Sequence, residues 1–331
     1  MSTAMNALEL RQSGVDFDLQ MTQQPIPTLG EHELLIAIEY VAINHLDARL
    51  AQDGFSPWEY PHILGSDAVG TVIDAPKGVF PTKGTRVLFN ANLVEQGMLK
   101  EYAVMPNFAV SEVPDSIASD IAASLPNAGM TALLALKKLQ LQEGQSFAIN
   151  NAAGAVAHFA VQYAKRQGAQ VFAFAEKSHH KRLTKLGADF AFDCTDNNIC
   201  AQIKRELGPG GFDCILNTQG GTTVIDDLTR LRFCGHLACL NGFHDIGEAL
   251  LFEKAPTIGV VSLGGAWLAN SLCAQQHLSF MGSQLLQDVA NGSITPPAVK
   301  HIPFTADAIR DVLIQMADST CTQRPVVKIQ A

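Results

Sequence analysis

Cysteine is scarce and unevenly placed in this sequence of 331 residues, because none of its seven cysteines precedes Cys194. Their number is odd, and no two of them form a CxxC pair. Both facts argue against a disulfide framework. We expect the seven thiols to be reduced and buried.

Long apolar runs and an excess of basic charge are missing as well. No apolar run approaches the roughly 18 residues needed to span a bilayer, and the first residues lack a basic start followed by an apolar stretch. We therefore expect no membrane insertion and predict a cytoplasmic location. The formal net charge is -9 and the pI is about 5.5. This balance argues against nucleic-acid binding, since phosphate backbones are bound by clustered Lys and Arg.

The sequence does contain two different patterns of apolar segments. Residues 33–74 carry short apolar strands broken by glycine and proline, which is typical of a β-rich unit. From residue 145, strands alternate with helices, which indicates a doubly wound parallel sheet. The last apolar segment, RPVVKIQ, has no place in that order and is expected to return to the first unit. We predict an α/β protein in which a Rossmann domain at 124–266 is inserted between 1–123 and 267–331.

A turn of small residues follows the first strand of the predicted Rossmann domain. Ala153, Gly154, Ala155 and Val156 lie between that strand and an amphipathic helix. Small residues there let backbone N–H groups approach a pyrophosphate at the helix N-terminus. The GxGxxG fingerprint is absent, so we expect ordinary dihedrals throughout or Gly154 alone at positive φ. A tight turn without a ligand is the alternative, and the surrounding strand and helix order favours nucleotide binding.

The end of the next strand, QVFAFA, bears on the choice of cofactor. Glu176 could bind the ribose hydroxyls of NAD. Lys177, Ser178 and Arg182 could instead surround the 2′-phosphate of NADP through charge-assisted hydrogen bonds. A solvated helix start without a ligand is a third interpretation. We favour NADP(H) over NAD(H).

Several segments, in order, resemble motifs of the medium-chain dehydrogenase/reductase superfamily, in its zinc-independent, quinone oxidoreductase-like branch. They include VAINHLD (41–47), LGSDAVG (64–70), LPNAGMTA (125–132), AAGAVAHFAVQYAK (152–165) and LGAD (186–189). The resemblance implies a GroES-like catalytic domain interrupted by the Rossmann domain, and hydride transfer with a nicotinamide cofactor. The sequence departs from the family pattern at Ala155 and Ala157 in the turn and at Asn127. It departs again at Arg324, which with Pro325 replaces a common Gly-Lys.

The resemblance also implies that no catalytic metal is bound. Zinc enzymes of the superfamily hold their ion with Cys, His and Cys, which align here with Asn44, Ser66 and Asn127. Asp67 occupies a neighbouring acidic position and cannot hold zinc alone. Without a Lewis acid, oxidation of a simple alcohol is disfavoured. A quinone or an α,β-unsaturated carbonyl accepts hydride directly, because the resulting charge delocalises.

The residues expected to serve this reaction come from both predicted domains. Asn44 and Asn127 offer amide donors to the nicotinamide or to the substrate oxygen, and both could instead tie down turns. Asp47 is a candidate for proton transfer, although we favour a role in capping the helix that follows Asn44. Further cofactor contacts are expected at the entry to the Rossmann domain and at its strand ends, from Thr131, Thr218, Leu240 and Asn241.

The expected partner is a small-molecule electron acceptor. We also predict a homodimer, because the edge strand TIGVVSLG would otherwise leave backbone groups unpaired. Two alternative functions stay open. One is a zinc-free, alcohol dehydrogenase-like reductase of another carbonyl compound. The other is a non-catalytic protein that binds NADPH as a redox sensor, since fold alone does not prove chemistry.

Overall fold

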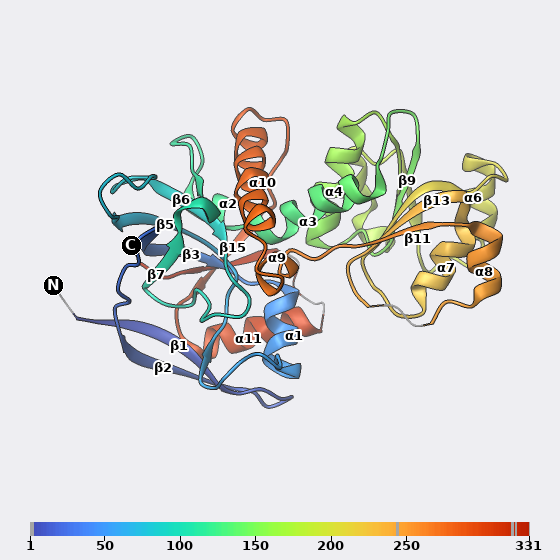
Figure 1. Ribbon diagram of the computed structural model, residues 1–331. Coiled ribbons are helices and arrows are strands. Elements are labelled where there is room, and N and C mark those ends of the chain that lie inside the picture. Colours follow the sequence, from blue (N-terminus) through green and yellow to red (C-terminus); the bar gives the residue numbers. More distant parts are fainter. Residues whose placement is uncertain (1–2, 243–244, 319–320, 322, 331) are drawn as a thin grey trace. The chain divides into compact units, whose positions relative to one another are not determined.

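The computed structural model describes residues 3–242, 245–318, 321 and 323–330 (Figure 1). The chain forms two compact units, one made of Met1–Met130 with Leu263–Ala331 and the other of Thr131–Ser262. Each unit is described by itself. The exact domain boundaries drawn from the sequence, after residues 123 and 266, stay predictions.

Mainly antiparallel β-sheets build the first unit. One sheet runs in the order β15-β16-β3-β5-β6-β8 with β7 paired to β3, and a smaller sheet has the order β2-β1-β4. Buried side chains alternate along β3 at Leu34, Ile36 and Ile38, as expected for a sheet with one packed face. The strands are β1 (Ala4–Gln12), β2 (Asp18–Pro25), β3 (Glu33–Ala42), β4 (His62–Ile63), β5 (Asp67–Asp74), β6 (Arg86–Asn90), β7 (Tyr102–Pro106), β8 (Ser111–Glu112), β15 (Val299–Pro303) and β16 (Arg324–Lys328).

The last strand of the chain completes this sheet. β16 pairs in antiparallel fashion with β3 and in parallel fashion with β15. The register places Val326 opposite Ala42, so Arg324 comes close to the residues that follow β3. The expectation that the final segment returns to the first unit is confirmed.

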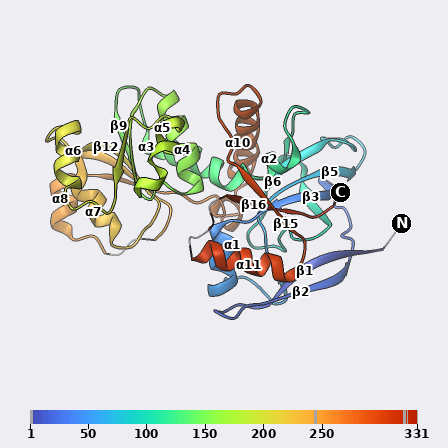
Figure 2. The same cartoon turned by 180° about the vertical axis from the view of Figure 1, so that it is seen from behind.

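Helices pack around the sheets of the first unit (Figures 1 and 2). They are α1 (His45–Asp53), the 3-10 turn η1 (Asn107–Ala109), α2 (Ser119–Ala123), the π-helical turn η2 (Pro126–Met130), α9 (Gly265–Leu268), α10 (Leu272–Ala290) and α11 (Ala306–Ala317). Ser271 and Thr305 cap α10 and α11 by accepting a hydrogen bond from a first-turn N–H. Among the residues that the structure describes, no helix is long and apolar enough to cross a membrane.

Parallel strands in the order β11-β10-β9-β12-β13-β14 form the second unit. The chain starts at the central β9, winds outward to β11, and then returns to build the other half from β12, which is the doubly wound topology predicted from the sequence. The strands are β9 (Ser146–Ile149), β10 (Gln170–Ala175), β11 (Phe190–Asp193), β12 (Phe212–Asn217), β13 (Leu231–Cys239) and β14 (Thr257–Val260). The helices are α3 (Thr131–Leu139), α4 (Ala155–Arg166), the 3-10 turn η3 (Lys177–His179), α5 (His180–Leu186), α6 (Ile199–Leu207), α7 (Thr223–Arg230) and α8 (Glu248–Lys254).

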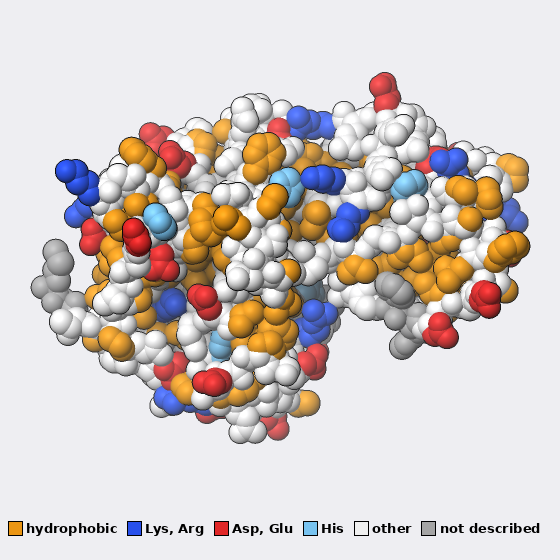
Figure 3. Space-filling model, viewed as in Figure 1, with side chains coloured by type: hydrophobic (Ala, Val, Ile, Leu, Met, Phe, Trp, Pro, Cys, Tyr) orange, Lys and Arg blue, Asp and Glu red, His pale blue; other side chains and the backbone are white. Residues whose placement is uncertain are grey.

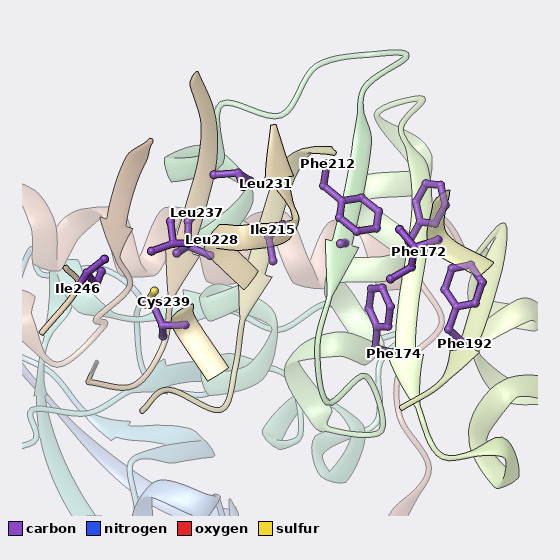
Figure 4. Close-up of a cluster of buried hydrophobic side chains, with 13 residues drawn as sticks. Phe172, Phe174, Phe192, Phe212, Ile215, Leu228, Leu231, Leu237, Cys239 and Ile246 are labelled. Atoms are coloured by element: carbon purple, nitrogen blue, oxygen red, sulfur yellow. The ribbon is translucent and has the colours of Figure 1, made fainter. Parts of the chain in front are cut away.

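A phenylalanine-rich core supports one face of this parallel sheet (Figure 4). Phe172 packs edge-on against Phe212 at 5.1 Å between ring centroids, and Phe174 meets Phe192 at 5.6 Å. Buried aromatic side chains of this size contribute strongly to core stability. The core therefore gives the loops at the carboxyl ends of β9, β12 and β13 a rigid support.

The cysteines are all free, but their burial differs from the expectation. Cys214 and Cys239 lie buried in strands, whereas Cys194, Cys200, Cys234 and Cys273 are exposed. The prediction of buried thiols is wrong for these four. Cys200 and Cys273 lie on the solvent-facing sides of α6 and α10, and such a position is not evident from cysteine spacing.

Candidate functional site

In the second unit, a tight turn joins β9 to α4. Its one non-glycine residue with positive φ is Asn151, at 44°, whereas Gly154 has an ordinary φ of -71°. Both alternatives expected for this turn, ordinary dihedrals throughout or Gly154 alone at positive φ, are therefore wrong. Asn151 takes the positive φ, which its short polar side chain tolerates. Ala152 N–H donates to the carbonyl of Phe174 on β10 at 2.8 Å, which ties the turn to the sheet.

The space beside Gly154 is open. A Cβ added there would meet only the Asn151 carbonyl oxygen, at 3.6 Å, which is ordinary contact. Gly154 is the N-cap of α4 and has no side chain with which to cap it. The first-turn N–H groups of Ala155 and Val156 thus present the positive end of the helix dipole without a side-chain acceptor. This arrangement fits a phosphate group.

Arg182 lies against the carbonyl side of the same turn. Its Nη2 donates to the Ala153 carbonyl at 2.7 Å and to the Ala152 carbonyl at 3.5 Å. Lys177 and Ser178 lie apart from it in the exposed turn η3, directly after β10. Glu176 is exposed too and is the N-cap of η3. The three residues expected around a 2′-phosphate thus divide into one that supports the turn and two that face solvent.

A buried carboxylate joins the loops after β9 and β12. Asp227 on α7 is 4% exposed, and its Oδ2 accepts hydrogen bonds from the amides of Asn150 at 2.8 Å and Asn217 at 2.7 Å. Asn150 Oδ1 in turn accepts from Thr218 N–H at 2.7 Å. We call these four residues the Asp227 network. Burial raises the pKa of Asp227 to about 6.

The expected cofactor residues at the strand ends meet around this network. Asn241 donates from its amide to the Thr218 carbonyl at 2.8 Å, and Leu240 N–H donates to the Asn217 carbonyl at 3.0 Å. Thr218, Leu240 and Asn241 are therefore brought together beside the turn after β9. Thr131 begins α3 and is half-buried, and it takes no part in these contacts.

In the first unit, a second buried carboxylate forms the centre of a polar cluster. Asp67 is fully buried, and its Oδ2 accepts from Asn44 Nδ2 at 3.1 Å, Asn127 N–H at 2.9 Å and Arg324 Nη2 at 3.2 Å. Its Oδ1 accepts from Asn90 Nδ2 at 2.8 Å. We call these five residues the Asp67 network. The Arg324 guanidinium also donates to the Asn44 side-chain oxygen and to the Ile43 carbonyl.

Asp47 has a different role beside this network. Its Oδ2 accepts from Asn44 N–H at 2.7 Å, and its Oδ1 accepts from Gly65 N–H at 3.2 Å. As the third residue of α1, it reaches back to the N-cap residue Asn44, which is half of a capping box. The capping role favoured from the sequence is thus the geometry observed. Burial raises the pKa of Asp47 to about 6.

Asn127 differs from Asn44 in its side chain. It lies in η2 and is half-buried, and its side-chain amide has no hydrogen-bond partner in the part of the chain that the structure describes. Asn44 is 2% exposed and uses both side-chain atoms within the Asp67 network. Single π-turns often occur at functional sites. Asn127 therefore carries the more available donor.

A small pocket in the first unit has Asp47 and Ser66 in its lining, whereas Asp67 and Asn127 are not among its lining residues. Its lining is largely apolar, with Trp58 stacked on His62 at 3.9 Å between ring centroids. Ser66 is 8% exposed, and its buried Oγ has no hydrogen-bond partner among the described residues. The lining residues are Asp47, Leu50, Trp58, His62, Ile63, Leu64, Gly65, Ser66, Asn92, Leu93, Glu95 and Gly97. The pocket thus offers hydrophobic walls and one unsatisfied hydroxyl.

Several of these residues are not found by sequence reasoning. Asn150, Asn90 and Asp227 carry no motif, although Asp227 follows Val224 by three residues and precedes Leu228 on the buried side of α7. An acidic residue on the apolar side of a predicted helix is the one feature of the sequence that could have pointed to Asp227. Arg324 is visible in the sequence only as a departure from the family pattern.

Two family models match the chain: an alcohol dehydrogenase GroES-like domain at residues 30–115 and a zinc-binding dehydrogenase at residues 155–281. A mitochondrial NAD(P)H oxidoreductase of Bos taurus is 30% identical over 342 residues, covering 92% of this chain and 84% of that protein. The chain belongs to the medium-chain dehydrogenase/reductase superfamily. The resemblance and the fold class read from the motifs are confirmed.

Other relatives within the medium-chain dehydrogenase/reductase superfamily are oxidoreductases by name. A trans-enoyl reductase of Aspergillus terreus is 31% identical over 204 residues, covering 56% of this chain and 67% of that protein. A solved mycobacterial quinone oxidoreductase is 25% identical with a TM-score of 0.81, covering 98% of this chain and 99% of that one.

One of the two matching family models is named for zinc binding, but the described residues do not bring together the ligands that zinc requires. No three His, Cys, Asp or Glu side chains of the described ranges come together as a possible metal site. At the aligned ligand positions stand Asn44, Ser66 and Asn127, and the Arg324 guanidinium lies against Asp67 and Asn44. A fixed positive charge next to these neutral side chains does not fit a divalent cation.

Proposed function

We propose that this protein transfers hydride from a nicotinamide cofactor to a quinone or an α,β-unsaturated carbonyl, without a catalytic metal. The observation that carries the proposal is the Asp67–Arg324 pair, which places a guanidinium beside the aligned ligand positions. Without a Lewis acid, the acceptor has to be one whose product charge delocalises. Relatives named trans-enoyl reductase and quinone oxidoreductase support this acceptor class.

For the cofactor, the proposal is NADP(H) in preference to NAD(H). Gly154 and the first turn of α4 supply the open phosphate site, and the exposed Lys177 and Ser178 follow β10, where the adenosine ribose of such folds binds. Arg182 would add its charge from the other side of the turn. A mycobacterial relative, 25% identical, has been solved with NADPH. The exposed Glu176 is the feature that would instead favour NADH.

In this proposal the acceptor binds in the first unit, against the small pocket that Ser66 and Trp58 line and near Asn127, which lies outside that lining. Bound NADPH would supply the hydride. Ser66 Oγ and the Asn127 side-chain amide would donate to the oxygen on which negative charge develops. Trp58 and Leu93 would exclude water from the acceptor, which strengthens both hydrogen bonds. The Asp67 network would fix Asn127 through its backbone N–H.

A homodimer and a cytoplasmic location also belong to the proposal. β14 is the edge strand of the parallel sheet. Val260 on β14 is 56% exposed, and Phe252 on the preceding helix α8 is 88% exposed. Figure 3 shows hydrophobic side chains on the surface of the molecule. Pairing of two β14 strands would cover such an edge. A species of one chain's mass in light scattering at micromolar concentration would contradict the dimer.

An acceptor screen tests the proposed activity. The purified protein and NADPH are mixed, in separate reactions, with 9,10-phenanthrenequinone, 1,4-benzoquinone, a 2-enal and a simple ketone. A further reaction contains the protein, NADP⁺ and a simple alcohol. The proposal expects NADPH oxidation with a quinone or the enal, and no NADP⁺ reduction with the alcohol. Turnover of the ketone alone would favour the carbonyl-reductase alternative. Cofactor binding with no turnover at all would favour the redox-sensor alternative.

A further inference from the structure

The Asp227 network fixes two loops through the side chains of two asparagines. Each asparagine donates its amide to Asp227 and uses its oxygen on a loop backbone: Asn150 Oδ1 accepts from Thr218 N–H at 2.7 Å, and Asn217 Oδ1 from Gly220 N–H at 2.6 Å. The Asn150 backbone leads directly into the turn that ends at Gly154. One carboxylate therefore sets the relation between the phosphate turn and the loop after β12.

Packing alone does not explain a carboxylate at this position. Val224 and Leu228 occupy the same buried side of α7 and belong to the hydrophobic core. An apolar side chain at position 227 would extend that core, whereas a buried carboxylate has to be desolvated. Buried charged groups are often replaceable by apolar ones without loss of stability. The presence of Asp227 therefore points to a function in positioning.

The location of the network suggests what is positioned. β9 and β12 are neighbours at the point where the strand order reverses. In open α/β sheets, ligands bind outside the carboxyl ends of the strands at this reversal. Thr218 and Asn241, joined by a hydrogen bond of 2.8 Å, lie on the same edge.

We propose that Asp227 is a positioning residue for the dinucleotide, which holds the phosphate turn and the loop after β12 in one binding geometry only while its carboxylate is ionised. The proposal rests on the nicotinamide cofactor of the proposed function. An ionised acceptor makes stronger hydrogen bonds to two amides than a protonated one does. Loss of the charge would let Asn150 and Asn217 rotate, and both loops would become mobile.

The charged groups around Asp227 are few. On its own helix, Arg230 Nη1 lies 3.6 Å from Asp227 Oδ1, and the exposed Asp226 adds a like charge. From β13, Cys239 faces it as a neutral thiol whose pKa burial raises to about 11. The contacts from β12 and from the turn after β9 are uncharged asparagines. With the pKa of Asp227 raised to about 6, its protonation falls in an accessible pH range.

The test is a fluorescence titration of NADPH against wild-type protein, Asp227→Asn and Asp227→Ala, with Asp226→Asn as the matched control. For the wild type, Kd is expected to rise about tenfold between about pH 7 and about pH 5, as protonation of one group of this pKa predicts. Asp227→Asn keeps an oxygen acceptor and cannot titrate, so its Kd should vary less with pH. Asp227→Ala should bind about tenfold more weakly than wild type even at neutral pH.

The 2′-phosphate of NADPH titrates near the same pH, and its contribution is common to all variants. The inference therefore depends on the difference between wild type and Asp227→Asn, measured also with NADH. Equal pH profiles for wild type and Asp227→Asn, or wild-type affinity in Asp227→Ala, would overturn it. Circular dichroism melting of each variant separates loss of fold from loss of binding. Absence of NADPH and NADH binding in the wild type would instead refute the proposed function.

Discussion

At the residue scale, two asparagines with the same expected role have different surroundings. Asn44 is buried with its side chain engaged by Asp67 and Arg324. Asn127 gives only its backbone N–H to Asp67 and keeps its side-chain amide available. Of the two, Asn127 is therefore the better candidate donor to a developing oxyanion, and Asn44 the better candidate for a structural role.

Replacing Asn127 with alanine is expected to lower kcat about 100-fold, the usual effect of removing one donor to an oxyanion. NADPH affinity should change by less than about threefold, because the phosphate site that we propose, at Gly154, belongs to the other unit. Asn107→Ala is the matched control, since Asn107 is also half-buried and its side-chain amide donates to the Phe80 carbonyl, away from the Asp67 network. Steady-state kinetics with a quinone measures both. Equal kcat values for Asn127→Ala and the control would remove Asn127 from the mechanism.

The Asp67–Arg324 pair gives a stability prediction. The two side chains are 0% and 5% exposed, so Arg324→Met leaves a buried carboxylate without its cation and should cost about 3–5 kcal/mol of unfolding free energy. The double variant Asp67→Asn/Arg324→Met removes both charges and should be more stable than Arg324→Met alone. Urea denaturation followed by circular dichroism gives the three values. A single variant as stable as wild type would show that the pair does not stabilise the first unit.

At the element scale, the turn between β9 and α4 keeps space for a ligand. An alanine Cβ at position 154 has only one neighbour, at 3.6 Å, and the backbone there has an ordinary φ. The fold thus tolerates a larger residue than glycine at position 154, and in the proposed function the free space next to the first turn of α4 receives the pyrophosphate.

Gly154→Ala is accordingly expected to leave the melting temperature nearly unchanged and to weaken NADPH binding about tenfold, because the methyl group would meet the pyrophosphate. Gly210→Ala, in the loop before β12, is the control: a Cβ there also meets nothing and its φ is not positive. Calorimetry and fluorescence titration measure the two effects. Unchanged NADPH affinity in Gly154→Ala would mean that the cofactor does not approach this turn.

The elements were more predictable than the contacts between them. Alternation of Leu34, Ile36 and Ile38 along β3, and the strand-helix order after residue 145, are local patterns that the sequence displays directly. Arg324 and Asp67 are 257 positions apart, and only the folded sheet brings them together. Likewise, the sequence predicted ordinary dihedrals or a positive φ at Gly154 alone, whereas Asn151 has the positive φ in a turn that Ala152 ties to Phe174 on the neighbouring strand.

At the scale of the whole molecule, a buried carboxylate in each unit accepts hydrogen bonds from the side-chain amides of two asparagines: Asp67 in the first unit and Asp227 in the second. Asp67 joins the ends of β3, β6 and β16 to η2, and Asp227 joins the loops after β9 and β12. We interpret the first as the support of an acceptor site and the second as the support of a cofactor site. Both interpretations depend on the same central claim, which is hydride transfer without a metal.

The most direct test of that claim is the rate of NADPH oxidation by 9,10-phenanthrenequinone, measured on one protein sample before and after treatment with a zinc chelator, with zinc content determined by mass spectrometry. We predict far less than one zinc per chain and the same rate in both states. About one zinc per chain together with a rate that falls on chelation and returns on zinc addition would contradict this prediction.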